Sequence, residues 1–320
     1  MGKQYRTTRT LGVYPITAGG FITVDLPRQY DLEALHVTLD AVVQVTAAAT
    51  SVKSYAPCQL LPRVELVADG KNTVYSGSLL LARIGNQARG LTQGNAAVAP
   101  SGTAVASYTV GATATIDLQS ADTVRPKDTN FRTSGLQLWQ ARFSIGQAGD
   151  MFQGGTAALT SGTITLTVDE CVELPDAAGG YSMPAFMKRV STQSVTFAGA
   201  QSNFDFRLPA GNLIRDVSVY AADANGSALN NTLTNLKLAA GLDVRFACSG
   251  SQARMRQFAE FGAQVTGLFM MDFCAQSPAF GQVGNLSNLW DVTGSVEPKL
   301  TVDVSSACVL EVRTTELIRL

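Results

Sequence analysis

A strand–corner–strand pattern that occurs twice is the feature that most constrains how this chain can fold. Residues 21–39 and 204–219 each contain an alternating apolar segment, a Leu-Pro step and a second alternating segment. Pro27 and Pro209 are 182 residues apart (209 minus 27). The same offset aligns apolar positions in the two copies: Ile22 with Phe204, Val24 with Phe206, Leu26 with Leu208, Leu32 with Ile214, Leu35 with Val217 and Val37 with Val219. The sequence therefore predicts a duplicated β domain.

Three further features follow in the same order in each half. They are a strand pair with a turn (63–75 and 236–247), a Ser-Gly-Ser step that opens a helix closing on Gly90 or Gly262, and a later strand (163–168 and 299–304). The second helix carries Met255, Phe258 and Phe261 at intervals of three, which favours an apolar stripe that packs into the core. The shared order of these features supports duplication.

The length of the chain and the positions of its Pro and Gly residues predict where the domains begin and end. A length of 320 residues suits two domains, and Pro and Gly cluster between residues 174 and 184. We expect an N-terminal arm over 1–18, a first β domain over 19–174, a linker over 175–187 and a second β domain over 188–320. Residues 91–135 add a Thr-, Ala- and Gly-rich segment with an alternating strand inside it (105–110, then 114–118), and we interpret this segment as a surface tower or an intersubunit clasp.

The expected arm is polar and carries three cations, Lys3, Arg6 and Arg9. It is either a frayed terminus or an extended basic segment. A basic segment could hold a neighbouring subunit, an anionic membrane surface or packaged nucleic acid.

The charge content favours contacts between proteins. Charged residues make up only 15% of the chain and the net charge is −1, so a surface built to bind specific nucleic acid is not expected. Arginine supplies 17 of the 24 cations, as is usual where charged groups lose water at contacts, although a genome rich in G and C would produce the same bias. No apolar run approaches the length of a membrane span.

The cysteines and the N-terminus indicate the compartment. Five cysteines without C-x-x-C spacing, four of them in apolar strand patterns, predict buried free thiols and a reducing compartment. The first ten residues lack the apolar core of a signal peptide, so we expect synthesis in a cytoplasm.

Catalytic patterns are weak. The single histidine, His36, lies in the middle of a predicted strand, and we expect a satisfied or solvent-facing imidazole. The cysteines are too scattered for a zinc site, and the Gly-Gly pairs at 154–155 and 179–180 lack the flanking residues of a phosphate loop. We expect no catalytic residues, no cofactor and no metal site, which makes an enzyme the weakest interpretation.

Taken together, two tandem β domains, a helix after the hairpin of each, and a polar arm resemble the double jelly-roll major capsid proteins. This lineage includes those of tectiviruses, corticoviruses, finnlakeviruses and the adenovirus hexon. The segment 56–73 (APCQLLPRVELVADGKNT) is also similar to capsid proteins of small bacteriophages with an internal membrane. The resemblance covers nearly the whole chain.

The resemblance implies an all-β fold of two tandem eight-stranded jelly-roll β-barrels with short helices in loops. It implies a homotrimer whose six barrels form a pseudo-hexameric capsomer of an icosahedral virion shell, assembled in the host cytoplasm. The implied partners are neighbouring capsomers, penton and minor capsid proteins, and the viral internal membrane through the interior-facing residues Lys3, Arg6 and Arg9.

Two other classes stay open at this level. A phage spike or lectin-like binding protein built of two β-sandwich domains would gather aromatic and acidic residues in loops at one barrel end, and residues 91–135 are the place to find them. An enzyme on a double β-sandwich would need acidic residues that converge in a cleft.

Overall fold

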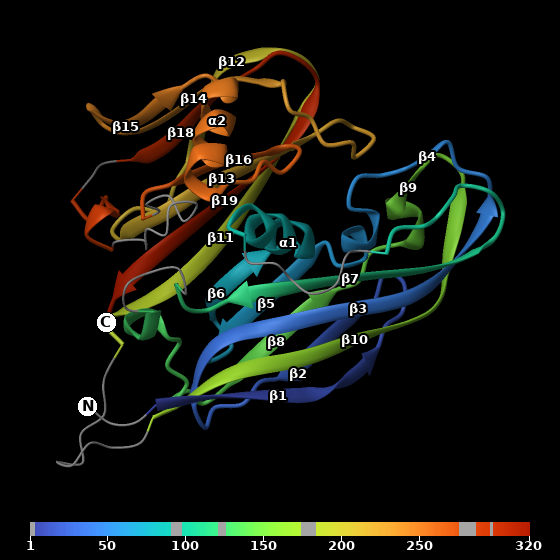
Figure 1. The fold of residues 1–320 in the computed structure, drawn as a ribbon, viewed down its shortest axis with the longest axis horizontal. Coiled ribbons are helices and arrows are strands. Elements are labelled where there is room, and N and C mark those ends of the chain that lie inside the picture. Colours follow the sequence, from blue (N-terminus) through green and yellow to red (C-terminus); the bar gives the residue numbers. More distant parts are fainter. Residues whose placement is uncertain (1–3, 91–97, 121–125, 174–183, 275–285, 295–296) are drawn as a thin grey trace.

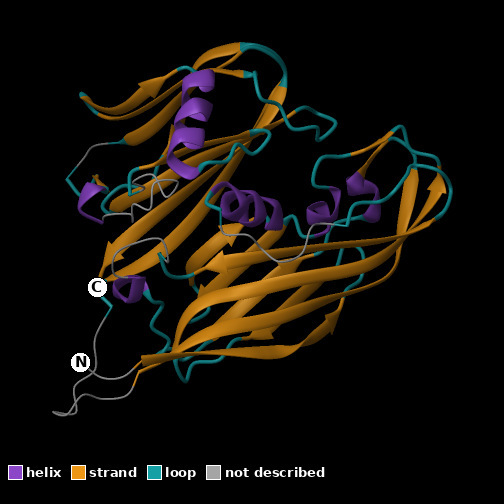
Figure 2. Cartoon of the chain, viewed as in Figure 1, coloured by secondary structure: helices purple, strands orange, loops and turns teal. Residues whose placement is uncertain are grey.

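The fold was obtained as a computed structural model and is built almost entirely of β-strands (Figure 2). The structure describes residues 4–90, 98–120, 126–173, 184–274, 286–294 and 297–320. Within these ranges two α-helices occur, α1 (Leu79–Ala88) and α2 (Gly250–Phe261). The remaining short elements are β4 (Ser51–Val52), β9 (Phe152–Gln153), β17 (Trp290–Asp291) and the 3₁₀ turns η1 (Ala56–Leu60), η2 (Pro126–Thr129), η3 (Ala148–Met151) and η5 (Leu286–Asn288).

The first half of the chain forms a barrel of two four-stranded antiparallel sheets. One sheet has the order β1-β10-β3-β7, and the other has the order β2-β8-β5-β6. The strands are β1 (Gln4–Pro15), β2 (Phe21–Asp25), β3 (Asp31–Ala47), β5 (Arg63–Ala68), β6 (Asn72–Gly77), β7 (Ser107–Asp117), β8 (Trp139–Ser144) and β10 (Thr156–Glu173). This arrangement of eight strands is a jelly roll.

The second half repeats this topology strand for strand. Its sheets have the orders β11-β19-β13-β16 and β12-β18-β14-β15, and all neighbours are antiparallel. The strands are β11 (Phe186–Phe197), β12 (Gln201–Arg207), β13 (Leu213–Ala222), β14 (Leu233–Ala240), β15 (Asp243–Cys248), β16 (Leu268–Asp272), β18 (Pro298–Val304) and β19 (Cys308–Arg319). The predicted fold class, two tandem eight-stranded jelly rolls, is confirmed.

The repeated strand–corner–strand pattern occupies equivalent places in the two barrels. β2 and β3 correspond to β12 and β13. The aligned residues Leu32 and Ile214 are fully buried, as are Leu35 and Val217. The apolar side chains of these strands therefore occupy equivalent positions in the cores of the two barrels.

One of the predicted correspondences is wrong. Strand 163–168 belongs to β10, whose equivalent in the second barrel is β19, whereas 299–304 belongs to β18, the equivalent of β8. The two segments share alternating burial, and a period of two residues cannot tell one buried strand of a barrel from another.

The two helices are capped by different serines of their Ser-Gly-Ser steps, so the N-cap positions differ by two residues. Ser78, the second serine of its step, accepts a hydrogen bond from Leu81 N at 3.2 Å and caps α1. Ser249, the first serine of its step, caps α2 by accepting from Gln252 N at 3.3 Å. Gly90 and Gly262 follow the helices with φ of 68° and 70°, the left-handed conformation expected for a glycine at this position.

Most of the predicted arm is strand β1, an edge strand of the first barrel. It pairs with β10 from Gln4↔Glu173 to Pro15↔Thr163, with an irregularity between Thr10 and Gly12. An edge strand is held by backbone hydrogen bonds and can keep polar side chains, so its sequence shows no apolar period.

The domain boundaries follow the ends of strands. β10 ends at Glu173 and β11 begins at Phe186, whereas residues 175–183 of the predicted linker lie outside the described residues. The alternating strand predicted over 105–110 and 114–118 is β7, which is continuous. The rest of the predicted tower or clasp includes 91–97 and 121–125, which also lie outside the described residues.

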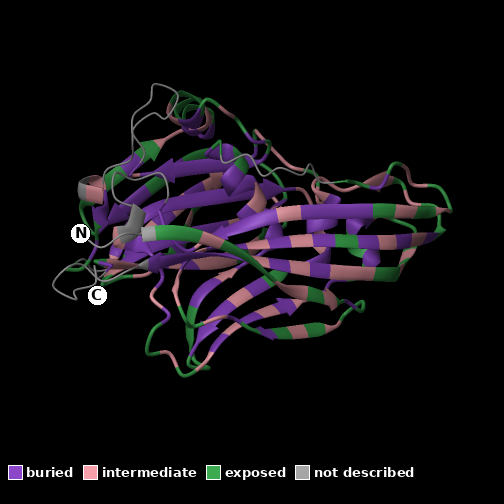
Figure 3. Ribbon diagram, turned by 60° about the horizontal axis from the view of Figure 1, so that its bottom comes forward, coloured by how far each residue is buried: buried purple, intermediate pink, exposed green. Residues whose placement is uncertain are grey.

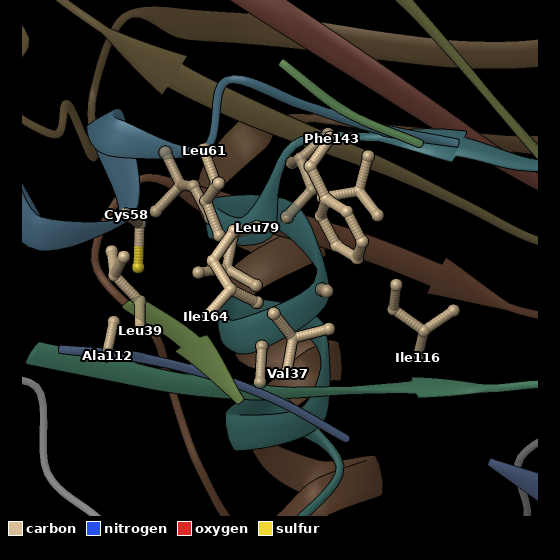
Figure 4. Packing of buried hydrophobic residues seen from close by; sticks show 14 of the residues in the cluster. Val37, Leu39, Cys58, Leu61, Leu79, Ala112, Ile116, Phe143 and Ile164 are labelled. Carbon is tan, nitrogen blue, oxygen red and sulfur yellow. The ribbon is translucent and has the colours of Figure 1, made fainter. Parts of the chain in front are cut away.

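The two barrels are joined through one sheet. β11 of the second barrel lies beside β6 of the first in parallel, with Val190 paired to Tyr75, so the two sheets form one continuous surface (Figures 1 and 3). In the first barrel, α1 closes the core: Leu79 packs among Cys58, Leu61 and residues of the facing strands such as Ile164 (Figure 4). The same apolar cluster extends into the second barrel through Tyr220 and Met270.

Candidate functional site

Buried charges join the two barrels where α1 of the first barrel meets the β11-β19-β13-β16 sheet of the second (Figure 1). Arg89, at the C-terminal end of α1, places Nη2 2.6 Å from Asp216 Oδ2 on β13 and 3.2 Å from Asp272 Oδ2 on β16. All three side chains are at most 3% exposed. A single arginine of one barrel therefore bridges two carboxylates of the other.

A second arginine balances the charge of this cluster. Arg215 lies 3.8 Å from Asp216 Oδ2 through Nε and 3.7 Å from Asp272 Oδ2 through Nη2. Asp216 Oδ1 also accepts from Thr315 Oγ1 at 3.1 Å. Burial opposes ionisation of Asp216, but Arg89, Arg313 and Arg215 hold its pKa below the ordinary value. We call Arg89, Arg215, Asp216 and Asp272 the joint cluster.

Two more basic side chains of the second barrel donate hydrogen bonds to backbone carbonyls of the first. Arg313 Nη1 donates to Leu81 O at 3.3 Å, and Lys188 Nζ donates to Gln119 O at 3.2 Å. Gly85 of α1 leaves room for Arg313, because a Cβ at that position would lie 2.6 Å from Arg313 Nη1. Burial lowers the pKa of Lys188 to about 7. These directional bonds fix how the barrels sit against each other.

His36 has two hydrogen-bond partners on neighbouring strands. Its Nδ1 lies 2.7 Å from Thr115 Oγ1 on β7, and its Nε2 lies 3.0 Å from Asp169 Oδ2 on β10. The expected satisfied imidazole is confirmed, and the contacts form a cross-strand polar ladder. The described residues contain no group of His, Cys, Asp and Glu side chains that could hold a metal ion. None of the helices described is long and apolar enough to cross a membrane.

The thiols match the expectation from the sequence. None of the five cysteines is in a disulfide, and Cys58, Cys171, Cys274 and Cys308 are buried. Burial raises the pKa of Cys58 to about 12, which keeps that thiol protonated.

The predicted basic residues of the N-terminal segment are paired within the first barrel. Arg6 Nε lies 2.5 Å from Glu33 Oε2, and Arg9 Nη2 lies 2.9 Å from Glu170 Oε1. The arginine side chains remain 54% and 49% exposed, so surface ion pairs of this kind hold β1 only modestly. Lys3 lies outside the described residues.

The exposed large apolar side chains include three on β1 and β2 of the first barrel and four on the β14–β15 turn, β15 and α2 of the second. Tyr5, Val13 and Phe21 lie on β1 and β2 of the first barrel, which we call the β1–β2 patch. The second group lies on the β14–β15 turn, β15 and α2 of the second barrel, and we call it the α2 patch: Leu242, Val244, Met255 and Phe258. Figure 1 shows β1 and β2 along one side and β15 and α2 along the other.

The sequence placed the α2 stripe wrongly. Of the three residues predicted to pack into the core, only Phe261 is buried, and Met255 and Phe258 are 69% and 57% exposed. Ala253 and Gln257 occupy the buried face instead. These two residues are four positions apart, which is the spacing of one helix face. Because Gln257 is polar, the buried face could not be recognised from apolar residues alone.

Comparison with solved structures identifies the fold. The chain superposes on the crystal structure of the STIV MCP with a TM-score of 0.73 at 16% identity, covering 99% of this chain and 97% of that one. The atomic structure of Sulfolobus Turreted Icosahedral Virus contains a chain that matches with a TM-score of 0.71 at 17% identity, covering 99% and 91%. The major capsid protein P2 from Bacteriophage PM2 matches with a TM-score of 0.67 at 11% identity, covering 99% and 98%.

These likenesses establish that the chain has the double jelly-roll fold of those proteins over its whole length. Neither a family model nor a curated protein matches its sequence. At identities of 11–17% the fold is shared while most side chains differ, so the joint cluster and the two patches must be interpreted from this chain itself.

Proposed function

We propose that this chain is the major capsid protein of an icosahedral virus and serves a structural, non-enzymatic role in the virion. The observation that carries the proposal is the whole-chain match to a major capsid protein, which covers 99% of this chain and 98% of that one. Two jelly rolls with the same strand order, joined side by side, provide two similar blocks from each copy.

The joint cluster suits such a building block. A shell subunit must present both barrels at a constant angle, because a small error at each contact accumulates around a closed particle. Buried ion pairs and hydrogen bonds are directional and are lost together when the barrels separate. Apolar packing alone would allow the barrels to slide with less penalty.

The two exposed apolar patches support a homotrimer. Because they lie on different barrels and opposite sides, the α2 patch of one copy can cover the β1–β2 patch of the next. Contacts between unlike surfaces close into a ring when the rotation between copies allows it, and three copies would form a ring of six barrels. This arrangement gives the pseudo-hexameric capsomer.

The remaining partners follow from a shell position. Neighbouring capsomers, penton and minor capsid proteins would contact the outer barrel surfaces, after synthesis and assembly in the host cytoplasm. The N-terminal end of β1, where Arg6 and Arg9 are half exposed, would face the interior and an internal membrane, while Val13 near its other end and Phe21 beyond it would meet the neighbouring copy.

The trimer can be tested with one double variant. Met255→Glu/Phe258→Glu places two charges on the α2 patch and should convert trimers to monomers in sedimentation velocity, since a desolvated carboxylate destabilises an apolar contact. Val105→Glu, at an exposed valine of the first barrel, is the matched control and should leave the trimer intact. A stable wild-type monomer at high concentration would contradict the assignment.

Electron microscopy separates the shell from the spike. Hexagonal capsomers or closed shells in the purified wild-type protein support a capsid role, whereas elongated isolated projections on particles would identify a spike.

A further inference from the structure

A cleft of about 310 Å³ lies at the junction of the two barrels, close to the point where β6 and β11 run side by side (Figure 1). One wall is formed by the start of β5, the end of β6 and the N-cap of α1, and the other by β11 and β19 of the second barrel. A volume of this size accommodates a small organic ligand, and such sites often lie between domains. The proposed shell role assigns no task to this cleft.

Glu311 of β19 places a carboxylate in this cleft without a cationic partner. Its side chain is partly buried, and Oε2 accepts a hydrogen bond from Ser78 Oγ at 3.2 Å. Within the part of the chain that the structure describes, Glu311 forms no ion pair. Burial raises the pKa of Glu311, and the hydrogen bond from Ser78 opposes that shift. A carboxylate that has lost part of its water and has no counter-charge favours the binding of a cation.

Two positive groups lie at the cleft, and neither neutralises Glu311. Arg63 belongs to the lining, but its Nε and Nη2 lie 3.0 and 2.6 Å from Glu65 Oε1, so it is already paired. The N-terminus of α1 meets Glu311 through Ser78, and a helix end supplies only about half an elementary charge. The carboxylate of Glu311 therefore still lacks a full counter-charge.

The other polar groups of the lining leave mainly acceptors unused. Thr192 Oγ1 donates its proton to Ser76 O at 2.9 Å, and Gln193 Nε2 donates to Arg207 O at 2.6 Å. Among the described residues, Gln193 Oε1 and the hydroxyls of Ser76 and Ser194 make no hydrogen bond. Guanidinium and ammonium groups carry several donors and no acceptor, so they match this set.

We propose that this cleft binds a guanidinium or primary ammonium group, which donates hydrogen bonds to Glu311, to Gln193 Oε1 and to the hydroxyls of Ser76 and Ser194. Two sources share this chemistry: a small organic cation free in solution, and an arginine or lysine side chain of a second copy of this chain. The second source rests on the proposed trimer, whereas the first does not.

The probe is Nα-acetyl-arginine amide, titrated into the full chain by isothermal titration calorimetry at low ionic strength. Nα-acetyl-citrulline amide is the matched control, because it has nearly the same shape and no charge. We expect one arginine amide to bind per chain, at least about tenfold more tightly than citrulline amide, since hydrogen bonds between charged groups are about twice as strong as neutral ones.

Variants assign the binding to this cleft. Glu311→Gln keeps the size of the side chain and removes its charge, so it should weaken arginine amide binding by about tenfold or more. Glu297→Gln makes the same change at an exposed position of the second barrel and should leave binding unchanged. Ser194→Leu narrows the cleft at an exposed position and should weaken binding without altering Glu311. Thermal unfolding of each variant checks that the fold is retained.

Trimers and monomers separate the two sources. The same titrations and substitutions are carried out in the wild type and in Met255→Glu/Phe258→Glu, which should be monomeric. Binding by the wild type identifies a free cation. Binding by the monomeric variant alone, with a wild type that sediments as a trimer, identifies a side chain of the neighbouring copy that already fills the cleft.

A monomeric wild type that binds the probe would contradict the proposed trimer and leave this site in place. The proposal itself is overturned if neither protein binds arginine amide, if citrulline amide binds as tightly, or if Glu311→Gln behaves like Glu297→Gln.

Discussion

Arg89 Nη2 lies 2.6 Å from Asp216 Oδ2, although the two residues belong to different barrels and are 127 positions apart in the chain. Both side chains are at most 3% exposed. Removal of one partner from a buried pair leaves an uncompensated charge in a medium that solvates it poorly. The attachment of one barrel to the other therefore depends on this contact more than on any surface ion pair.

Arg89→Ala tests this dependence. We expect the free energy of unfolding in urea to fall by about 3–5 kcal/mol, because Asp216 and Asp272 lose their shared partner. The matched control is Arg63→Ala, which breaks the exposed Arg63–Glu65 pair and should change the free energy by at most about 1 kcal/mol. Equal effects of the two variants would show that the joint cluster does not hold the barrels together.

Lys188 makes stability depend on pH. Its pKa falls from an ordinary 10.5 in the unfolded chain to about 7 in the folded one, because burial disfavours the charged form despite the attraction of Asp117, and Arg215, Arg89 and Arg313 add repulsion. Folding therefore releases a proton between these values, and the contribution of Lys188 to the free energy of unfolding rises with pH above about 7, by up to about 1.4 kcal/mol per pH unit.

The check is a series of urea titrations from pH 6 to 9 on the wild type and Lys188→Met. The difference in unfolding free energy, wild type minus variant, should increase with pH above about 7 and stay flat below it. A difference that does not change with pH would mean that Lys188 keeps its proton in the folded protein.

Serine substitutions test which serine of each Ser-Gly-Ser step caps the helix. Ser78→Ala should lower the free energy of unfolding by about 1 kcal/mol, because it removes the acceptor for Leu81 N, whereas Ser76→Ala should have little effect. In the second barrel the order reverses: Ser249→Ala should be costly and Ser251→Ala should not. Thermal unfolding of the four variants measures both pairs. A larger effect of Ser76 than of Ser78 would contradict the assigned cap.

Deletion of residues 1–15 tests the role of β1. Because β1 bonds to β10 along nearly its whole length, its loss should expose the β10 edge, lower Tm by roughly 5–10 °C and promote aggregation. Deletion of residues 1–3 is the control and should leave Tm unchanged. If the longer deletion folds normally and only assembly fails, the segment acts as an arm after all.

Much of the architecture was predictable from the sequence, because a strand that buries one face in a barrel shows alternating apolar residues. Leu35 and Val217 occur at the same step of the same alternation, and each lies in the core of its own barrel. The strand pair predicted over 63–75 is β5 and β6, and its turn lies at Asp69 and Gly70, which both have positive φ, as a tight hairpin requires. The edge strand β1 is polar and shows no such alternation.

The candidate site was not predictable in the same way. Arg89, Asp216 and Asp272 are isolated charges in the sequence, and nothing local distinguishes them from solvated residues such as Arg63. The exposure of Met255 and Phe258 was likewise hidden, since an apolar residue on a helix has the same local pattern whether it faces a core or another copy.

The sequence by itself determined that the chain holds two similar β-barrels. Successive side chains of a strand point to opposite faces, so the alternation of apolar and polar residues is a local property of each strand. Only the tertiary structure decided how the barrels meet, which charges are buried between them and which apolar side chains stay outside. These properties depend on residues that are distant in the chain and become neighbours only when both barrels have formed.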